Sequence, residues 1–249
     1  MHADTVRNGW EAAVVQQAVC ELIDIASGEA RRPIAIFAHS MGNLILAAAL
    51  DSRRCALPSA SSWVAIGAPW RGSKAADRLG AICSGKEGGI HFAGSLLRGL
   101  AEREHFCEGA GGAPSPAYGS LRTEGNYGLD VLAARWENVP NASTCGTSPF
   151  GLLSIDSLPL TALAEFAGFG SAPNDGAVAA AGCRAAGGSS ARWAEDVASP
   201  HYQADVNHFD LTCRHGENLL GLRPLGGVSQ RPCSWIVSRA AAAATGSYI

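Results

Sequence analysis

The chain has 249 residues, of which 47% are hydrophobic and 16% are charged, and its formal net charge at pH 7 is -3. This length and hydrophobic fraction predict one domain, residues 1–249, with a sizeable core. The sequence has no basic stretch typical of nucleic-acid binding and no apolar run of about 18 residues. It therefore predicts neither a nucleic-acid partner nor a stable membrane span.

The N-terminal part predicts an amphipathic helix over residues 8–27. Apolar side chains recur there at three- and four-residue spacing and form one stripe. The residues of this stripe are Val14, Ala18, Leu22 and Ile25. Short apolar runs at 34–38 and 61–67 predict buried strands, and residues 44–50 between them predict a helix. Strands that alternate with helices predict a mostly parallel sheet with helices on both faces, which is the α/β class.

The pattern is looser between residues 74 and 145. Helices are expected over 74–83 and 96–105, and a Gly-rich loop over 109–116. A loop of this length is usually functional or disordered. We interpret residues 74–145 as an insertion over the edge of the sheet, in the position of a cap or lid.

Downstream, the sequence predicts a further helix over 158–166 and a tight turn over 171–176. Residues 206–213 and 235–238 are the last organised segments.

The segment 33–43 carries the most informative pattern, because a strand, a sharp turn with a central serine and a helix follow one another. This is the context of a nucleophile elbow. Its strained turn needs small residues two positions from the serine, and Ala38 and Gly42 flank Ser40 in this way. We expect His39 to line the mouth of the site. The alternative is that this pentapeptide arises by chance in a chain rich in Ala and Gly.

A serine nucleophile needs a base, and the base needs an acid that orients it. Asp175 is the candidate acid, because it lies in an Asn-Asp-Gly turn that can aim a carboxylate at an imidazole. In the alternative interpretation, Asp175 only closes this turn. The helix behind Ser40 provides the backbone N–H of Met41 as an oxyanion donor.

Three histidines downstream of the acid are candidates for the base. His208 is preferred, because Asn207 and Asp210 can fix its loop. His215 lies in a polar surface turn, and His201 follows a proline without evident support, so both remain alternatives.

Four motifs give the chain a resemblance to the α/β-hydrolase fold and, within it, to the triacylglycerol lipase and serine esterase group. They are Ala-His-Ser-Met-Gly at 38–42, Gly-Ala-Pro-Trp-Arg-Gly-Ser at 67–73, Asn-Asp-Gly at 174–176 and Asn-His-Phe-Asp at 207–210. The resemblance covers roughly residues 9–215. It implies hydrolysis of a lipid or other carboxylic ester by a Ser40, Asp175 and His208 triad, without a metal or a cofactor.

Other readings stay open. Trp70, Phe92, Leu96 and Leu97 would line an apolar acyl pocket, or else pack in the core. Acyl transfer to another alcohol, or removal of a lipid anchor, would use the same triad. A non-catalytic binding protein on a hydrolase frame is the alternative from another class, and the oligomeric state is not indicated.

The sequence departs from the hydrolase pattern at its N-terminus. Only 33 residues precede the elbow strand, whereas a full hydrolase sheet has several strands there. A loop after one of these strands supplies the second oxyanion N–H. We therefore expect an N-terminally truncated sheet that lacks this donor.

Eight cysteines are dispersed along the chain, and no two of them form a C-x-x-C pair. An even, dispersed set favours disulfides and an oxidising compartment over a zinc site. The triplet Asn141-Ala142-Ser143 is a glycosylation acceptor sequence. Both features favour secretion or the endomembrane lumen, although the first residues do not resemble a signal peptide. The alternative is a cytosolic protein with free thiols, and the sequence leaves the pairing open.

Overall fold

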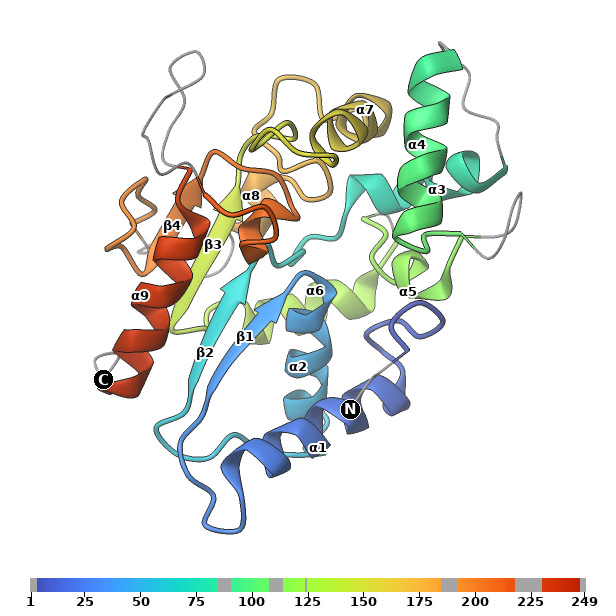
Figure 1. The fold of residues 1–249 in the computed structure, drawn as a ribbon. Helices are drawn as coiled ribbons and strands as arrows, with labels where there is room; N and C mark the ends of the chain where they lie inside the picture. The colour runs from blue at the N-terminus through green and yellow to red at the C-terminus, as the bar shows by residue number, and fades with distance from the viewer. Residues whose placement is uncertain are drawn as a thin grey trace.

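The computed structural model describes residues 4–84, 91–107, 114–123, 125–184, 192–217 and 230–246. In this part of the chain, four parallel strands form one sheet in the order β1-β2-β3-β4 (Figure 1). The strands are β1 (Ala35–His39), β2 (Ser62–Ile66), β3 (Ala142–Gly146) and β4 (His201–Ala204). Because neighbouring strands are parallel, their carboxyl ends meet at one edge of the sheet. The strands predicted at 34–38 and 61–67 are confirmed.

Helices cover both faces of this sheet (Figure 1). On one face, α2 (Met41–Asp51) contacts both α1 (Ala13–Ser27) and α6 (Tyr127–Trp136). On the other face, α9 (Pro232–Ala244) contacts β1. The strand β2 is buried along its whole length, so it is apolar at successive positions rather than at alternate ones.

Two core clusters follow from the alternation of side chains along β2. Trp63 and Ala65 belong to the cluster that includes Leu44 of α2. Val64 and Ile66 belong to the opposite cluster, with Trp235 of α9. The sheet is therefore the middle layer of three.

The remaining helices include a group at the carboxyl ends of the strands (Figure 1). This group comprises α3 (Lys74–Ser84), α4 (His91–Arg103), α5 (Pro116–Gly119) and α7 (Ser157–Ala167). Both α3 and α4 contact α7. Two short elements, α8 (Ala180–Cys183) and the 3-10 helix η1 (Asp210–Thr212), complete the described secondary structure.

The predicted insertion 74–145 contains parts with different positions in the fold. Its last four residues belong to β3, and α6 contacts α2 on the face of the sheet. Only α3, α4 and α5 lie over the end of the sheet (Figure 1). Residues 108–113 of the predicted Gly-rich loop lie outside the described residues. That these three helices form a cap or lid stays a prediction, as does the single domain 1–249.

The apolar stripe expected on the first helix faces outward. Three of its four residues are exposed, Val14 by 61%, Leu22 by 48% and Ile25 by 69%, and Ala18 is half-buried. The buried side of α1 carries Val15, Cys20 and Ile23 instead. The disulfide Cys20–Cys55 joins this side to the segment that follows α2.

All eight cysteines form disulfides, and each bond joins neighbours in the sequence order of cysteines. The pairs are Cys20–Cys55, Cys83–Cys107, Cys145–Cys183 and Cys213–Cys233. Four disulfides indicate an oxidising environment, secreted or lumenal. Among the described residues, the structure contains no helix with the length and apolarity needed to cross a membrane.

Candidate active site

Ser40 stands at the turn between β1 and α2. Its φ of 51° and ψ of -130° lie outside the regions that non-glycine residues ordinarily adopt. Such strain persists only where the surrounding structure imposes it, and it concentrates at functional sites. The N–H of Ser40 donates to the carbonyl of Ile66 at 2.8 Å, which ties the turn to the end of β2.

Asn43 holds the inner side of this turn. It is fully buried, and its amide group donates to the carbonyls of Ala38 at 2.8 Å and of Ser40 at 3.1 Å. Its side-chain oxygen accepts a hydrogen bond from Trp63 Nε1 at 3.1 Å. This role of Asn43 was not predicted, although an amide residue directly before the apolar run 44–50 is a local signal for side-chain hydrogen bonds to the backbone.

Asp175 and His208 are in direct contact. One oxygen of Asp175 accepts the backbone N–H groups of Ala177 at 3.0 Å and Val178 at 2.7 Å. The other oxygen lies 2.7 Å from Nδ1 of His208, and both side chains are buried. A carboxylate accepts hydrogen bonds only, so Nδ1 carries the proton.

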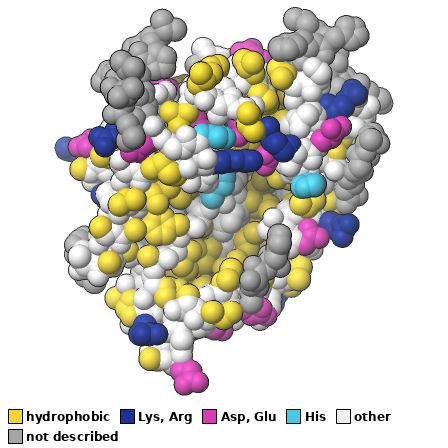
Figure 2. Space-filling view, viewed as in Figure 1, with side chains coloured by type: hydrophobic (Ala, Val, Ile, Leu, Met, Phe, Trp, Pro, Cys, Tyr) yellow, Lys and Arg dark blue, Asp and Glu magenta, His cyan; other side chains and the backbone are white. Residues whose placement is uncertain are grey.

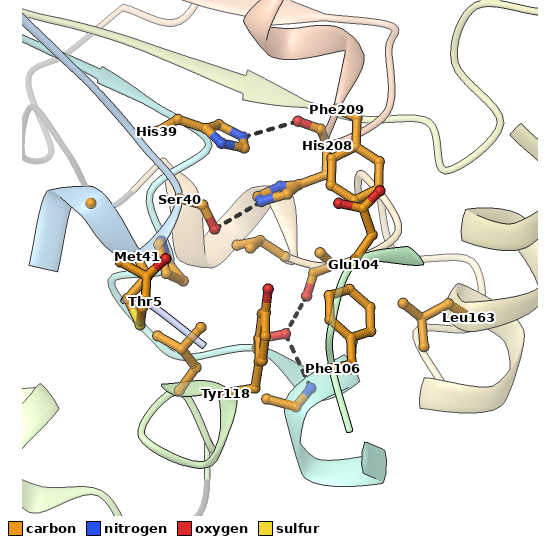
Figure 3. A pocket seen from close by; sticks show the side chains of 18 of the residues that line it. Thr5, His39, Ser40, Met41, Glu104, Phe106, Tyr118, Leu163, His208 and Phe209 are labelled. Atoms are coloured by element: carbon orange, nitrogen blue, oxygen red, sulfur yellow. Dashed lines mark hydrogen bonds between the residues drawn. The ribbon is translucent and has the colours of Figure 1, made fainter. Parts of the chain in front are cut away.

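The other ring nitrogen of His208 faces the serine. Nε2 of His208 lies 2.9 Å from Oγ of Ser40 (Figure 3). With the proton on Nδ1, Nε2 has a free lone pair that accepts the Ser40 hydroxyl. The structure thus brings the three predicted residues into one hydrogen-bonded chain, and their catalytic roles stay a prediction.

The loop that carries His208 is held by its neighbours. The side-chain oxygen of Asn207 accepts the N–H groups of Phe209 and Asp210, both at 3.0 Å. The carboxylate of Asp210 accepts the N–H of Leu152 at 2.8 Å, and burial raises the pKa of Asp210. These bonds agree with the expectation that Asn207 and Asp210 fix the loop.

Gly67 leaves room for the ring of His208. Its φ is 55°, a conformation that favours glycine. A Cβ atom at this position would lie 3.2 Å from Cε1 of His208 and 3.1 Å from the side chain of Leu211. A glycine after β2 therefore avoids tight contacts with the imidazole and with Leu211.

The two alternative bases have other partners. Nδ1 of His215 lies 2.8 Å from Asp210, and Nε2 lies 3.2 Å from the buried carboxylate of Asp156. His201 starts β4, its ring lies 5.5 Å from that of Trp193, and burial lowers its pKa. His215 and His201 therefore contact other side chains, whereas His208 contacts Ser40.

The other elbow residues lie as follows. Ala38 is buried, whereas a Cβ atom at Gly42 would have no other atom within 4 Å, so the expectation that the turn needs a small residue at position 42 is wrong. Met41 is the first residue of α2, where backbone N–H groups have no acceptor within the helix. Its N–H is therefore available next to Ser40. His39 lines the cavity at this point, as expected.

A cavity of about 450 Å³ opens beside Ser40 and His208. Its wall is largely apolar and includes Ile45, Leu79, Phe106, Leu121, Leu160 and Leu163. Figure 2 shows hydrophobic side chains around a recess in this face of the molecule. Two charged residues also line it, Glu104 and Arg214, and they pair at 3.2 Å. The volume and the wall suit a small apolar ligand or chain.

Trp70 is not part of this wall. It is fully buried, and its ring lies 6.0 Å from that of Trp63. Leu97 also belongs to the main core cluster, whereas the side chain of Phe92 lies outside what the structure describes. For Trp70 and Leu97 the structure therefore favours core packing, the alternative that the sequence left open. Within the described residues, no group of three or more His, Cys, Asp or Glu side chains is placed to hold a metal.

Comparisons with known proteins find a matching family and a similar crystal structure. Residues 16–103 match the lecithin:cholesterol acyltransferase family. The mature form of Bacillus licheniformis lipase BlEst2 is a similar crystal structure, with 18% sequence identity and a TM-score of 0.49 over 82% of this chain and 69% of that one. No curated protein sequence matches the chain significantly. The parallel sheet, the helices on both of its faces and the strained serine between β1 and α2 identify an α/β-hydrolase fold, with an N-terminal part similar to lipase-like acyltransferases.

Proposed function

We propose that this protein is a serine hydrolase that cleaves carboxylic esters, lipid esters above all, through an acyl-enzyme. One observation carries the proposal: the hydrogen-bonded chain from Ser40 through His208 to Asp175 borders an apolar cavity. A hydroxyl, an imidazole and a carboxylate in this order are the parts of a nucleophilic triad.

The proposed reaction has two halves. Ser40 Oγ attacks the ester carbonyl while Nε2 of His208 takes the hydroxyl proton, and the ester C–O bond then breaks as His208 returns that proton to the leaving alcohol. Water repeats the sequence on the acyl-enzyme and releases the acid. Asp175 keeps the Nδ1 proton in place and stabilises the imidazolium. The N–H of Met41 donates to the oxyanion, with support from the amino end of α2.

The surroundings of Ser40 support an apolar acyl group. The cavity wall offers aliphatic and aromatic side chains, and its two charged residues, Glu104 and Arg214, form an ion pair, while Glu104 also pairs with Arg103. The match of residues 16–103 to a family named for a phospholipid and sterol substrate supports lipid esters in particular. We further propose secretion or residence in the endomembrane lumen, which the four disulfides support.

A second candidate is acyl transfer to an alcohol other than water. The family match favours it, because the name of that family describes an acyltransferase. The same acyl-enzyme serves both reactions, and only the acceptor in the second half differs. Removal of a lipid anchor would also use this chemistry.

The test compares the unmodified protein with Ser40→Ala on a series of p-nitrophenyl esters of increasing chain length. Ser84→Ala is the matched control, because Ser84 ends α3 at an exposed position. We expect Ser40→Ala to abolish hydrolysis and fluorophosphonate labelling, and Ser84→Ala to keep both. Unchanged hydrolysis by Ser40→Ala would refute the triad, and a protein that never reacts with the probe would support the non-catalytic alternative. Product analysis with added alcohols separates hydrolysis from acyl transfer.

A further inference from the structure

We propose that His39 is a positioning residue that holds the catalytic loop against the nucleophile through the backbone carbonyl of His208. The inference rests on the proposed function, because it assigns His39 a part only if His208 is the base. His39 does not act on the substrate in this proposal. It acts through the backbone of the residue that does.

The first observation is a direct bond between the elbow and the base loop. Nε2 of His39 lies 3.0 Å from the backbone oxygen of His208, and Figure 3 shows the two rings side by side. Their centroids are 4.7 Å apart, with an angle of 43° between the planes. A carbonyl oxygen only accepts hydrogen bonds, so Nε2 of His39 is the donor.

The second observation is that the backbone of His208 is held on both sides. Its N–H donates to the carbonyl of Asp175 at 2.9 Å, and its C=O accepts from His39. Asp175 therefore holds the peptide group before His208, and His39 holds the peptide group after it. Because His39 directly precedes Ser40, this bond couples the position of the base to that of the nucleophile.

The third point concerns the charge of His39. Burial, together with the neighbouring His208, lowers the pKa of His39 to about 3. A neutral donor suits this position, because His208 gains a positive charge when it takes the serine proton. A cation on the adjacent ring would oppose that charge.

The test separates the donor from the bulk of the side chain. His39→Leu removes the N–H, whereas His39→Gln keeps an N–H donor on a side chain of similar reach. We expect His39→Leu to lower kcat by about 10–100-fold, with KM changed by less than about threefold, because small misplacements of reacting groups have effects of this size. His39→Gln should recover most of the loss. A change confined to KM, or equal losses in both variants, would overturn the proposal.

A charge variant tests the requirement for a neutral ring. His39→Lys places a cation beside His208, which disfavours the imidazolium and lowers the pKa of the base. We expect the acid limb of the kcat/KM profile to move to lower pH while the maximum rate falls. An acid limb that stays in place would contradict this part of the argument.

Two controls keep the inference separable from the proposed function. Activity that survives Ser40→Ala refutes the triad itself, whatever His39 does. Loss of activity in Ser40→Ala together with unchanged kcat in His39→Leu refutes the inference alone. If His39→Leu does not fold, as judged by its melting temperature, His39→Phe replaces it, because it keeps a ring without a donor.

Discussion

The pH dependence of the free energy of unfolding tests whether His39 stays unprotonated in the folded protein. An unfolded histidine titrates near 6.5, whereas burial in the folded state lowers the pKa of His39 to about 3. Between these values, the unfolded chain binds a proton that the folded protein does not bind. The free energy of unfolding therefore falls as the pH drops below 6.5, and this loss continues down to about pH 3.

The loss of stability at pH 5 is nearly the same for any folded pKa of His39 that lies well below 5, because the unfolded pKa of 6.5 then sets it. One pKa unit corresponds to about 1.4 kcal/mol, so His39 removes about 2 kcal/mol of stability between pH 7.5 and pH 5. Urea unfolding, followed by tryptophan fluorescence at several pH values, measures this loss. We expect His39→Gln to lose about 2 kcal/mol less than the unmodified protein over the same interval.

The comparison with a second histidine makes this prediction specific. His105 is exposed and has a φ of 54°, a conformation that asparagine tolerates, so His105→Asn is the matched control. It should leave the pH dependence unchanged. Burial also lowers the pKa of His201, so some acid sensitivity should remain in every variant. Parallel pH curves for His39→Gln and the unmodified protein would refute the reasoning.

Three further changes test other parts of the site. Asn43→Ala removes the side-chain donor to the carbonyls of Ala38 and Ser40 and leaves Nε1 of Trp63 without its acceptor, and it should lower the free energy of unfolding by about 2–3 kcal/mol in urea titrations. A loss below about 0.5 kcal/mol would contradict this role of Asn43. Gly67→Ala should displace the ring of His208 and lower kcat by about 10–100-fold in a folded protein, and unchanged kinetics would exclude this packing role. Replacing Cys145 and Cys183 together by serine should lower stability by about 2–5 kcal/mol, and an unchanged melting temperature would show that this bond is not needed.

Local patterns predicted the part of the fold around the elbow. The runs 34–38 and 61–67 are short successions of apolar residues that are visible in the sequence, and the second run, in β2, is buried along its whole length whereas β1 is only partly buried. The turn at Ser40 is equally local, since β1, Ser40 and α2 follow one another directly in the chain. These features need no knowledge of distant contacts.

The strands β3 and β4 were not predicted. The sequence of β3 is Ala-Ser-Thr-Cys-Gly, and its Ser143 and Thr144 are each only 1% exposed. Small polar residues give no apolar run, so their burial depends on the layers that cover them. The strand β4 has only four residues, too few for a periodic pattern to emerge.

The orientation of α1 and the bond of His39 have a common cause. Two apolar stripes lie on α1, and the one that packs inward carries Val15, Ile23 and the disulfide-bonded Cys20. The contact between His39 and His208 joins residues that are 169 positions apart. Both features depend on the assembled molecule, and spacing along the chain carries no information about either.

The order of the disulfides has a consequence for how the chain acquires them. The cysteines pair in sequence order, the first with the second, the third with the fourth and so on, over separations of 35, 24, 38 and 20 residues. The four closed loops follow one another without nesting or crossing. When such a chain is threaded into an oxidising compartment from its N-terminus, each partner emerges before the next pair begins. Synthesis itself then presents the native pairing, and an isomerase has few wrong bonds to reshuffle.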